Sequence, residues 1–218
     1  MSVATQLINL SAALLLLVSF AMLSQRRVRA LIDLFAVQGV LLAAATLLAA
    51  WSTGQPHLYA SAALTIVLKV IVLPLILLRL IRRLDLAADV EMLINTPTTM
   101  LVGIVLVVVA FNLALPIAQL AGTITRGTLG IAMASVLLSF LMMITRRMAV
   151  AQVIGFLAME NGLFFAATSV TYGMPMVVEL GIALDVLVGT FVFGVFFFRI
   201  RETFDSLDTQ HLERLKDR

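Results

Sequence analysis

The sequence predicts an all-α, polytopic membrane protein of about seven transmembrane helices, and three observations lead to this fold class. Of the 218 residues, 62% are hydrophobic and 12% are charged, and the mean hydropathy is +1.12. A water-soluble domain of this length cannot bury that much apolar surface, whereas a bilayer solvates it. The apolar residues form separate runs long enough to span roughly 30 Å of hydrocarbon. The basic residues cluster at the ends of these runs, as in proteins that a membrane orients.

Seven apolar runs follow one another along the chain. The first has no basic region before it and no small-residue cleavage site after it, so we expect a retained helix rather than a signal peptide. The longest linker is predicted to be a solvated loop, with a cytoplasmic surface helix as the alternative. The predicted spans are residues 5–24, 29–51, 58–79, 99–120, 127–145, 149–171 and 176–198. They divide the chain into a three-helix N-terminal half with this linker (1–98), a four-helix C-terminal half (99–198) and a polar tail (199–218).

The distribution of basic side chains predicts the orientation. With seven spans, Arg126 falls on one side of the membrane, Lys69 lies within a span, and the remaining thirteen basic residues share the other side. Because basic residues concentrate on the cytoplasmic side, the N-terminus is expected outside and the C-terminus in the cytoplasm. The thirteen are Arg26, Arg27, Arg29, Arg79, Arg82, Arg83, Arg146, Arg147, Arg199, Arg201, Arg214, Lys216 and Arg218.

Composition excludes several classes of function. The isoelectric point near 10.0 does not indicate a nucleic-acid binder, because the basic residues follow the membrane pattern. The chain has no cysteine, which excludes disulfides, iron–sulfur clusters and thiolate metal sites. His57 and His211 lie outside the apolar runs, which excludes a bis-histidine haem in the membrane. Phosphate-loop and dinucleotide fingerprints are absent. We therefore expect no cofactor, no metal and no catalytic residue.

Four ionisable residues of the predicted spans are candidates for a functional role, because a charge at the bilayer centre costs about 2.5–3.5 kcal/mol on insertion scales. Lys69 precedes Arg79 by ten residues, about 15 Å of helix, so it is expected near the midplane. Pro74 cannot donate to the carbonyl of Val70, which leaves an acceptor beside Lys69. Lys69 is predicted to carry protons, with helix-to-helix pairing to one acid as the structural alternative.

Three acids complete this set. Glu160, followed by Asn161, and Asp185 are both predicted to lie deep in the bilayer, whereas Glu179 lies nearer the outer surface, where water could solvate it. Each buried acid can take up and release a proton when a neighbouring charge moves. The sequence does not say which acid pairs with Lys69. Gln38 and Glu160 also occupy similar places after paired arginines, which leaves an internal duplication open.

Several segments resemble the hydrogenase-4 component E family, a longer relative of the K-type subunit of respiratory complex I and the C-type subunit of Mrp antiporters. They are RRMAVAQVIGFLAMENG from Arg146, ELGIALDVLV from Glu179, the string FFRIR, LTIVLKVIVLPLI around Lys69 and the tail DSLDTQHLERLK. The resemblance implies a membrane-arm subunit of a complex I-like hydrogenase or formate hydrogenlyase assembly, without redox chemistry of its own. It also implies a place in the cytoplasmic (inner) membrane of a bacterium or archaeon. The partners of the chain would be antiporter-like and hydrogenase-like or quinone-site-like subunits.

The resemblance also bears on the acids. The first intramembrane glutamate of the K-type subunit falls on Glu160. For the second, the local string favours Glu179 and depth favours Asp185, which is preferred. Two other functions stay open: a stand-alone secondary transporter for ions or small solutes, and a scaffold without a role in proton transfer. The sequence shows little sign of broken spans beyond Pro74 and the end of the fourth span at Pro116, which gives a transporter little room for a substrate pocket.

Overall fold

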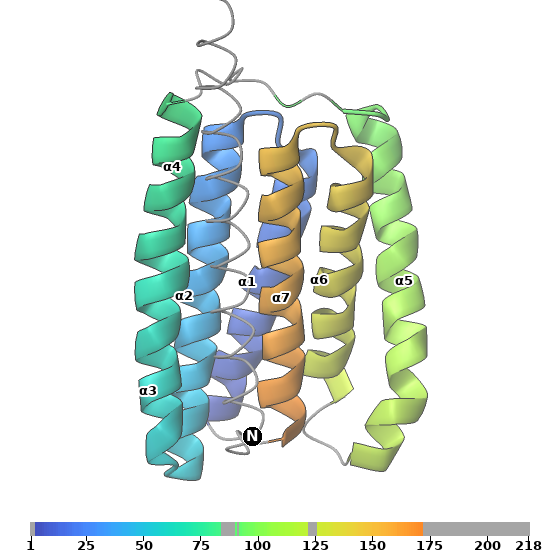
Figure 1. Ribbon diagram of the computed structural model, residues 1–218. Helices are drawn as coiled ribbons and strands as arrows, with labels where there is room; N and C mark the ends of the chain where they lie inside the picture. Colours follow the sequence, from blue (N-terminus) through green and yellow to red (C-terminus); the bar gives the residue numbers. More distant parts are fainter. Residues whose placement is uncertain (1–2, 84–89, 91, 122–125, 172–218) are drawn as a thin grey trace, which may run out of the picture. The chain divides into compact units, whose positions relative to one another are not determined.

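The computed structural model describes residues 3–83, 90, 92–121 and 126–171, and these residues are almost entirely helical (Figure 1). All of them belong to one compact unit, Met1–Ile182. The elements are α1 (Val3–Ser24), α2 (Val28–Thr53), α3 (Pro56–Thr65), the π-helix η1 (Ile66–Val72), α4 (Leu73–Arg83), α5 (Thr96–Ala121), α6 (Arg126–Thr145) and α7 (Ala149–Thr171).

Six of the predicted spans are confirmed as helices long and apolar enough to cross a membrane. Five are single helices, and the third consists of α3, η1 and α4 in continuous succession. Every boundary agrees with the prediction to within four residues. The seventh predicted span, residues 176–198, lies outside the described residues, and the orientation of the chain stays a prediction.

Four helices close a ring at the centre of the unit. Helix α1 packs against α2, α2 against α7, α7 against α6, and α6 against α1. The third span packs on the outside of α2, and α5 packs against α6 and α1 (Figure 1). The ring places α1 beside α6 and α2 beside α7, so that residues about a hundred or more positions apart in sequence are neighbours.

The outer surface of the helices is apolar. On α5, large hydrophobic side chains remain exposed along most of the helix, with Leu101 64% and Val105 61% accessible. Similar rows occur on α1 and on the third span. Exposed apolar surface of this extent is unstable in water but is solvated by lipid chains. The chain is therefore a multi-pass membrane protein.

Helix α2 ends at a tight turn that leads directly into the third span. Gly54 adopts a left-handed conformation with φ of +68°, and its N–H donates to the carbonyl of Ala50. Pro56 occupies the first turn of α3, where no N–H is needed. A side chain at residue 54 would strain this backbone, which explains the glycine.

The opposite end of the ring carries most of the described arginines, and we call it the arginine end. Here the linker from α4 joins two interhelical turns through backbone hydrogen bonds: Val90 N–H donates to Arg26 at 2.6 Å, and Leu93 N–H donates to Thr145 at 2.9 Å. The described linker residues before Thr96 are not helical, in line with the predicted loop, but Val90 is buried. The linker thus fastens the α1–α2 turn to the α6–α7 turn.

Arg146 is buried at this end although its sequence context indicated only a basic surface cluster. It is 1% exposed, and its Nη2 donates to the carbonyls of Leu23 at 2.8 Å and Met22 at 3.3 Å. These carbonyls belong to the last turn of α1, where partial negative charge accumulates and stabilises a nearby cation. Burial lowers the pKa of Arg146 to about 10, and nearby Arg26 acts in the same direction. The guanidinium still remains charged at neutral pH.

Replacement of Arg146 tests this contact. We expect Arg146→Gln to lower the free energy of unfolding by about 1–3 kcal/mol, because two buried carbonyls lose a charged donor. The neighbouring Arg147 is exposed, so Arg147→Gln should change stability by no more than about 0.5 kcal/mol. Thermal unfolding of the full chain in lipid nanodiscs measures both. Equal effects of the two substitutions would show that Arg146 acts only as one more surface charge.

Candidate functional site

An ion pair between Lys69 and Glu160 lies inside the protein. The ammonium nitrogen Nζ of Lys69 donates to Oε1 of Glu160 at 2.9 Å, and the two side chains are 1% and 2% exposed. Lys69 belongs to η1 and Glu160 to α7, so the pair connects two spans that lie 91 residues apart in sequence. Among the described residues, the structure therefore gives Glu160 as an acidic partner of Lys69.

Both residues lie at the middle of their spans, as predicted. Lys69 is central in the stretch Pro56–Arg83, and Glu160 is central in α7. A lysine there is too far from either end of the helix to place its amine in water by snorkelling. In a hydrocarbon environment the charge of each residue is costly alone, and the short hydrogen bond offsets part of the cost for both.

A glycine on α2 lets the third span approach closely enough for this pairing. A Cβ at Gly39 would lie 3.3 Å from both the Cβ of Lys69 and the Cγ2 of Val70. Larger side chains at this position would push the third span outward. Because α2 packs against both the third span and α7, the missing side chain keeps Lys69 within reach of Glu160.

Lys69 lies in a helix of unusual geometry. Residues 66–72 form a π-helix, and the N–H of Leu73 donates to the carbonyl of Leu68, five residues earlier. Pro74 follows directly, and in an α-helix its ring would collide with the carbonyl of Val70. The sequence indicated an unpaired carbonyl here but not a π-helix of seven residues. Such π segments are rare and occur frequently at functional sites. In contrast, α5 continues through Pro116 to Ala121.

Three neutral side chains form a second buried contact beside the ion pair. Asn161 Nδ2 on α7 donates to Gln38 Oε1 on α2 at 3.1 Å, and Gln38 Nε2 donates to Ser19 Oγ on α1 at 3.2 Å. Ser19 in turn donates to the carbonyl of Leu15. Consecutive residues point about 100° apart on a helix. Glu160 therefore faces η1 while Asn161 faces the ring of helices.

The predicted site residues fall into two groups. The structure brings Lys69 and Glu160 together, whereas Glu179 and Asp185 lie outside the described residues. Gln152, two turns before Glu160, instead donates to the carbonyl of Arg146 at 2.8 Å. The described part of the chain contains no group of three or more histidine, aspartate and glutamate side chains placed to hold a metal ion.

Sequence reasoning did not single out Ser19 or the burial of Arg146. A serine in a leucine-rich span often bonds only to its own helix, as the hydroxyls of Ser11 and Thr168 do here. Arg146 belongs to a pair of arginines at a helix end, the usual place for exposed basic residues. In both cases the hydrogen-bond partner lies on a neighbouring helix, so the local sequence does not indicate the contact.

Fold and site together define a multi-pass membrane protein with a lysine–glutamate ion pair buried between its spans. The chain is 35% identical over 97% of its length to the uncharacterized protein Rv0085 of Mycobacterium tuberculosis (strain ATCC 25618 / H37Rv), of which 96% is covered. It is 25% identical over 97% of its length to hydrogenase-4 component E of Escherichia coli (strain K12) and of Shigella flexneri, each 98% covered. The chain is thus a homologue of hydrogenase-4 component E over nearly its whole length. No family model and no solved structure matches it.

A double-mutant cycle tests the coupling of the pair. Lys69→Met or Glu160→Met alone leaves an uncompensated group inside the protein and should lower the free energy of unfolding by about 3–5 kcal/mol. The double substitution removes both groups and should cost less than either single one, because the apolar side chains suit their surroundings. Unfolding of the full chain in lipid nanodiscs measures all three. Additive losses would mean that the two side chains contribute independently.

Proposed function

We propose that this chain is a membrane-arm subunit of a complex I-like hydrogenase assembly, in which the Lys69–Glu160 pair forms part of a proton or ion path. The supporting observation is the pair itself: two opposite charges, 2.9 Å apart, at the centres of two membrane-length helices. Ionisable groups at this depth are rare and usually mark ion pathways. Two relatives are named hydrogenase-4 component E, which indicates the kind of assembly.

The proposed mechanism follows from the charges of the pair. A proton arriving on one side of the membrane binds the carboxylate of Glu160 and cancels its charge. The attraction between this carboxyl group and the ammonium of Lys69 then weakens, and the local field at neighbouring groups changes. Release of the proton to the next group restores the pair. Redox work in partner subunits would drive this cycle, and the chain itself performs no redox chemistry.

The remaining predictions belong to the same proposal. The N-terminal half (1–98) contributes Lys69, and the C-terminal half (99–198) contributes Glu160, so the pair joins the two halves. Asp185, or else Glu179, would be the next acid of the path. Seven spans would place the N-terminus outside, with the arginine end and the tail (199–218) in the cytoplasm.

A stand-alone secondary transporter is the second candidate, and the π-helix favours it. Transporters bind substrate where a spanning helix departs from regular α-helical geometry, and η1 is such a departure beside a charged residue, although the third span is continuous. The two candidates predict different isolation behaviour. A coupling subunit should isolate with hydrogenase-like and antiporter-like membrane partners, whereas a transporter should isolate alone or as copies of itself.

Reconstitution of the affinity-purified assembly into proteoliposomes tests the leading proposal. We expect Glu160→Gln and Lys69→Met to reduce redox-driven proton movement about tenfold or more, because the first removes the group that carries the proton and the second removes its counter-charge. Electron transfer itself should persist. A pH-sensitive dye inside the vesicles gives protons moved per electron, and mass spectrometry identifies the co-isolated subunits.

Thr168→Val is the matched control. Thr168 is buried on the same helix as Glu160, and its hydroxyl donates only within that helix, to Phe164 and Phe165. The substitution keeps the shape of the side chain and should preserve coupling. If the Glu160→Gln and Lys69→Met variants both move protons as the wild type does, the chain acts only as a scaffold. Isolation without redox partners would favour the transporter.

A further inference from the structure

The ammonium of Lys69 has an aromatic neighbour as well as its carboxylate partner. Its Nζ lies 5.6 Å from the centroid of the Phe164 ring, within the distance of about 6 Å at which a ring face attracts a cation. Phe164 is 6% exposed, so this contact is shielded from water. A desolvated cation–π contact is stronger than an exposed one.

Glu160 and Phe164 are one turn apart on the same helix. Residues at positions i and i+4 of an α-helix share a face, with about 6 Å between them along the axis. The ammonium therefore contacts a carboxylate at 2.9 Å and, on the same face of α7, an aromatic ring. The two neighbours differ in one respect. A proton can cancel the charge of the carboxylate, whereas the negative face of the ring remains the same.

We propose that Phe164 is a positioning residue that provides a second cation site for Lys69. When Glu160 is protonated, the ammonium moves along α7 toward the ring face, and it returns when the proton leaves. This inference rests on the proposed function, since it assigns what happens to Lys69 in the protonated half of the cycle. No covalent bond forms or breaks in this movement.

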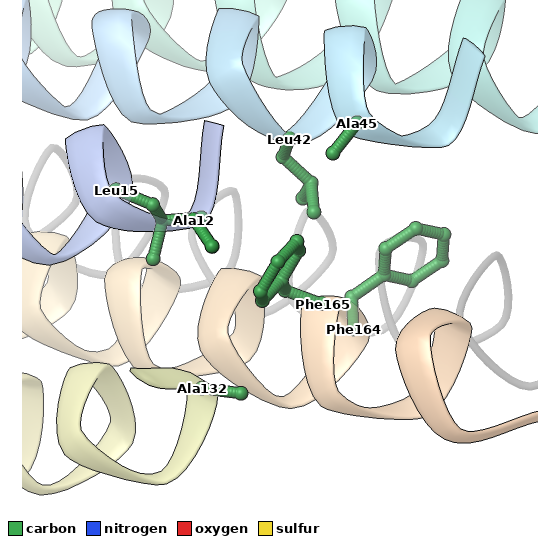
Figure 2. Close-up of a cluster of buried hydrophobic side chains, with 7 residues drawn as sticks. All are labelled: Ala12, Leu15, Leu42, Ala45, Ala132, Phe164 and Phe165. Atoms are coloured by element: carbon green, nitrogen blue, oxygen red, sulfur yellow. The ribbon is translucent and has the colours of Figure 1, made fainter. Parts of the chain in front are cut away.

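A test must distinguish attraction between the Phe164 ring and the ammonium from a role of Phe164 in packing alone. Phe164 belongs to a buried apolar cluster with Ala12, Leu15, Leu42, Ala45, Ala132 and Phe165. Figure 2 shows this cluster, in which the rings of Phe164 and Phe165 extend in different directions from α7. Phe165 thus has the same residue type, helix and burial as Phe164, and it supplies a matched control position.

Graded fluorination of the ring separates attraction from packing. Mono-, di- and trifluorophenylalanine weaken the negative face of the ring stepwise while its shape changes little. At position 164 of the reconstituted assembly, we expect redox-driven proton movement to fall with each fluorine, and by about tenfold in Phe164→Leu. The same series at position 165 should leave it unchanged. A flat series at position 164, or equal losses at both positions, would overturn the proposal.

A second measurement does not depend on proton transport. Lysine occurs only at positions 69 and 216, so labelling the full chain with ¹³C,¹⁵N-lysine in a Lys216→Arg background gives the signals of Lys69 alone. Solid-state NMR in lipid bilayers then reports the ring-current shift at its Cε and Nζ. We expect a larger shift in Glu160→Gln than in wild type, and its loss in Phe164→Leu.

The two measurements fail in different ways. If the ring-current shifts follow expectation but the assembly moves no protons, the proposed function is wrong and the cation site remains. If protons move and depend on Glu160, but the shift in Glu160→Gln is no larger than in wild type, the second site does not exist. Phe164→Tyr retains an aromatic face and should behave as wild type in the NMR experiment, which excludes a general effect of substitution.

Discussion

The buried contact between Lys69 and Glu160 is the constraint on which the arrangement of the spans depends. Lipid offers neither hydrogen bonds nor a high dielectric, so each charge has to find its partner within the protein. Glu160 lies on α7, beyond α2, and its side chain meets that of Lys69 where a residue of α2 has no side chain. This residue is Gly39, where a Cβ would lie 3.3 Å from the Cβ of Lys69. One ion pair thereby specifies how close three spans lie.

The ion pair and the amide chain beside it respond differently to protons. Ser19, Gln38 and Asn161 link α1, α2 and α7 through neutral hydrogen bonds, whose strength does not depend on a change of charge. The bond between Lys69 and Glu160 depends on both charges. Glu160 and Asn161 are adjacent, so α7 presents a titratable group to the third span and a neutral one to the ring. In the proposed cycle, this division would keep the ring intact while the charge of the ion pair changes.

Much of this architecture could be predicted from the sequence, because run length, arginine position and helical rise are local quantities. They placed six spans, and the depths of Lys69 and Glu160, close to where the structure has them. The identity of the pair could not be predicted, since it depends on which helices are neighbours and how each is rotated about its axis. For the same reason the roles of Ser19 and Phe164 could not be predicted: a serine or a phenylalanine in an apolar run usually has no polar partner on another helix.

The π-helix, which the sequence also did not reveal, follows from the spacing of buried residues in the third span. Ser61, Thr65, Lys69, Leu73 and Leu77 are all buried and recur every four residues. Four residues exceed an α-helical turn by about 40°, so over four steps the stripe would drift by roughly 160° and face lipid. Hydrogen bonds to the fifth residue take more residues into each turn and cancel much of this drift. Because the π-helix occupies Ile66–Val72, Lys69 stays on the side of the span that contains Ser61 and Leu77, and its ammonium reaches Glu160.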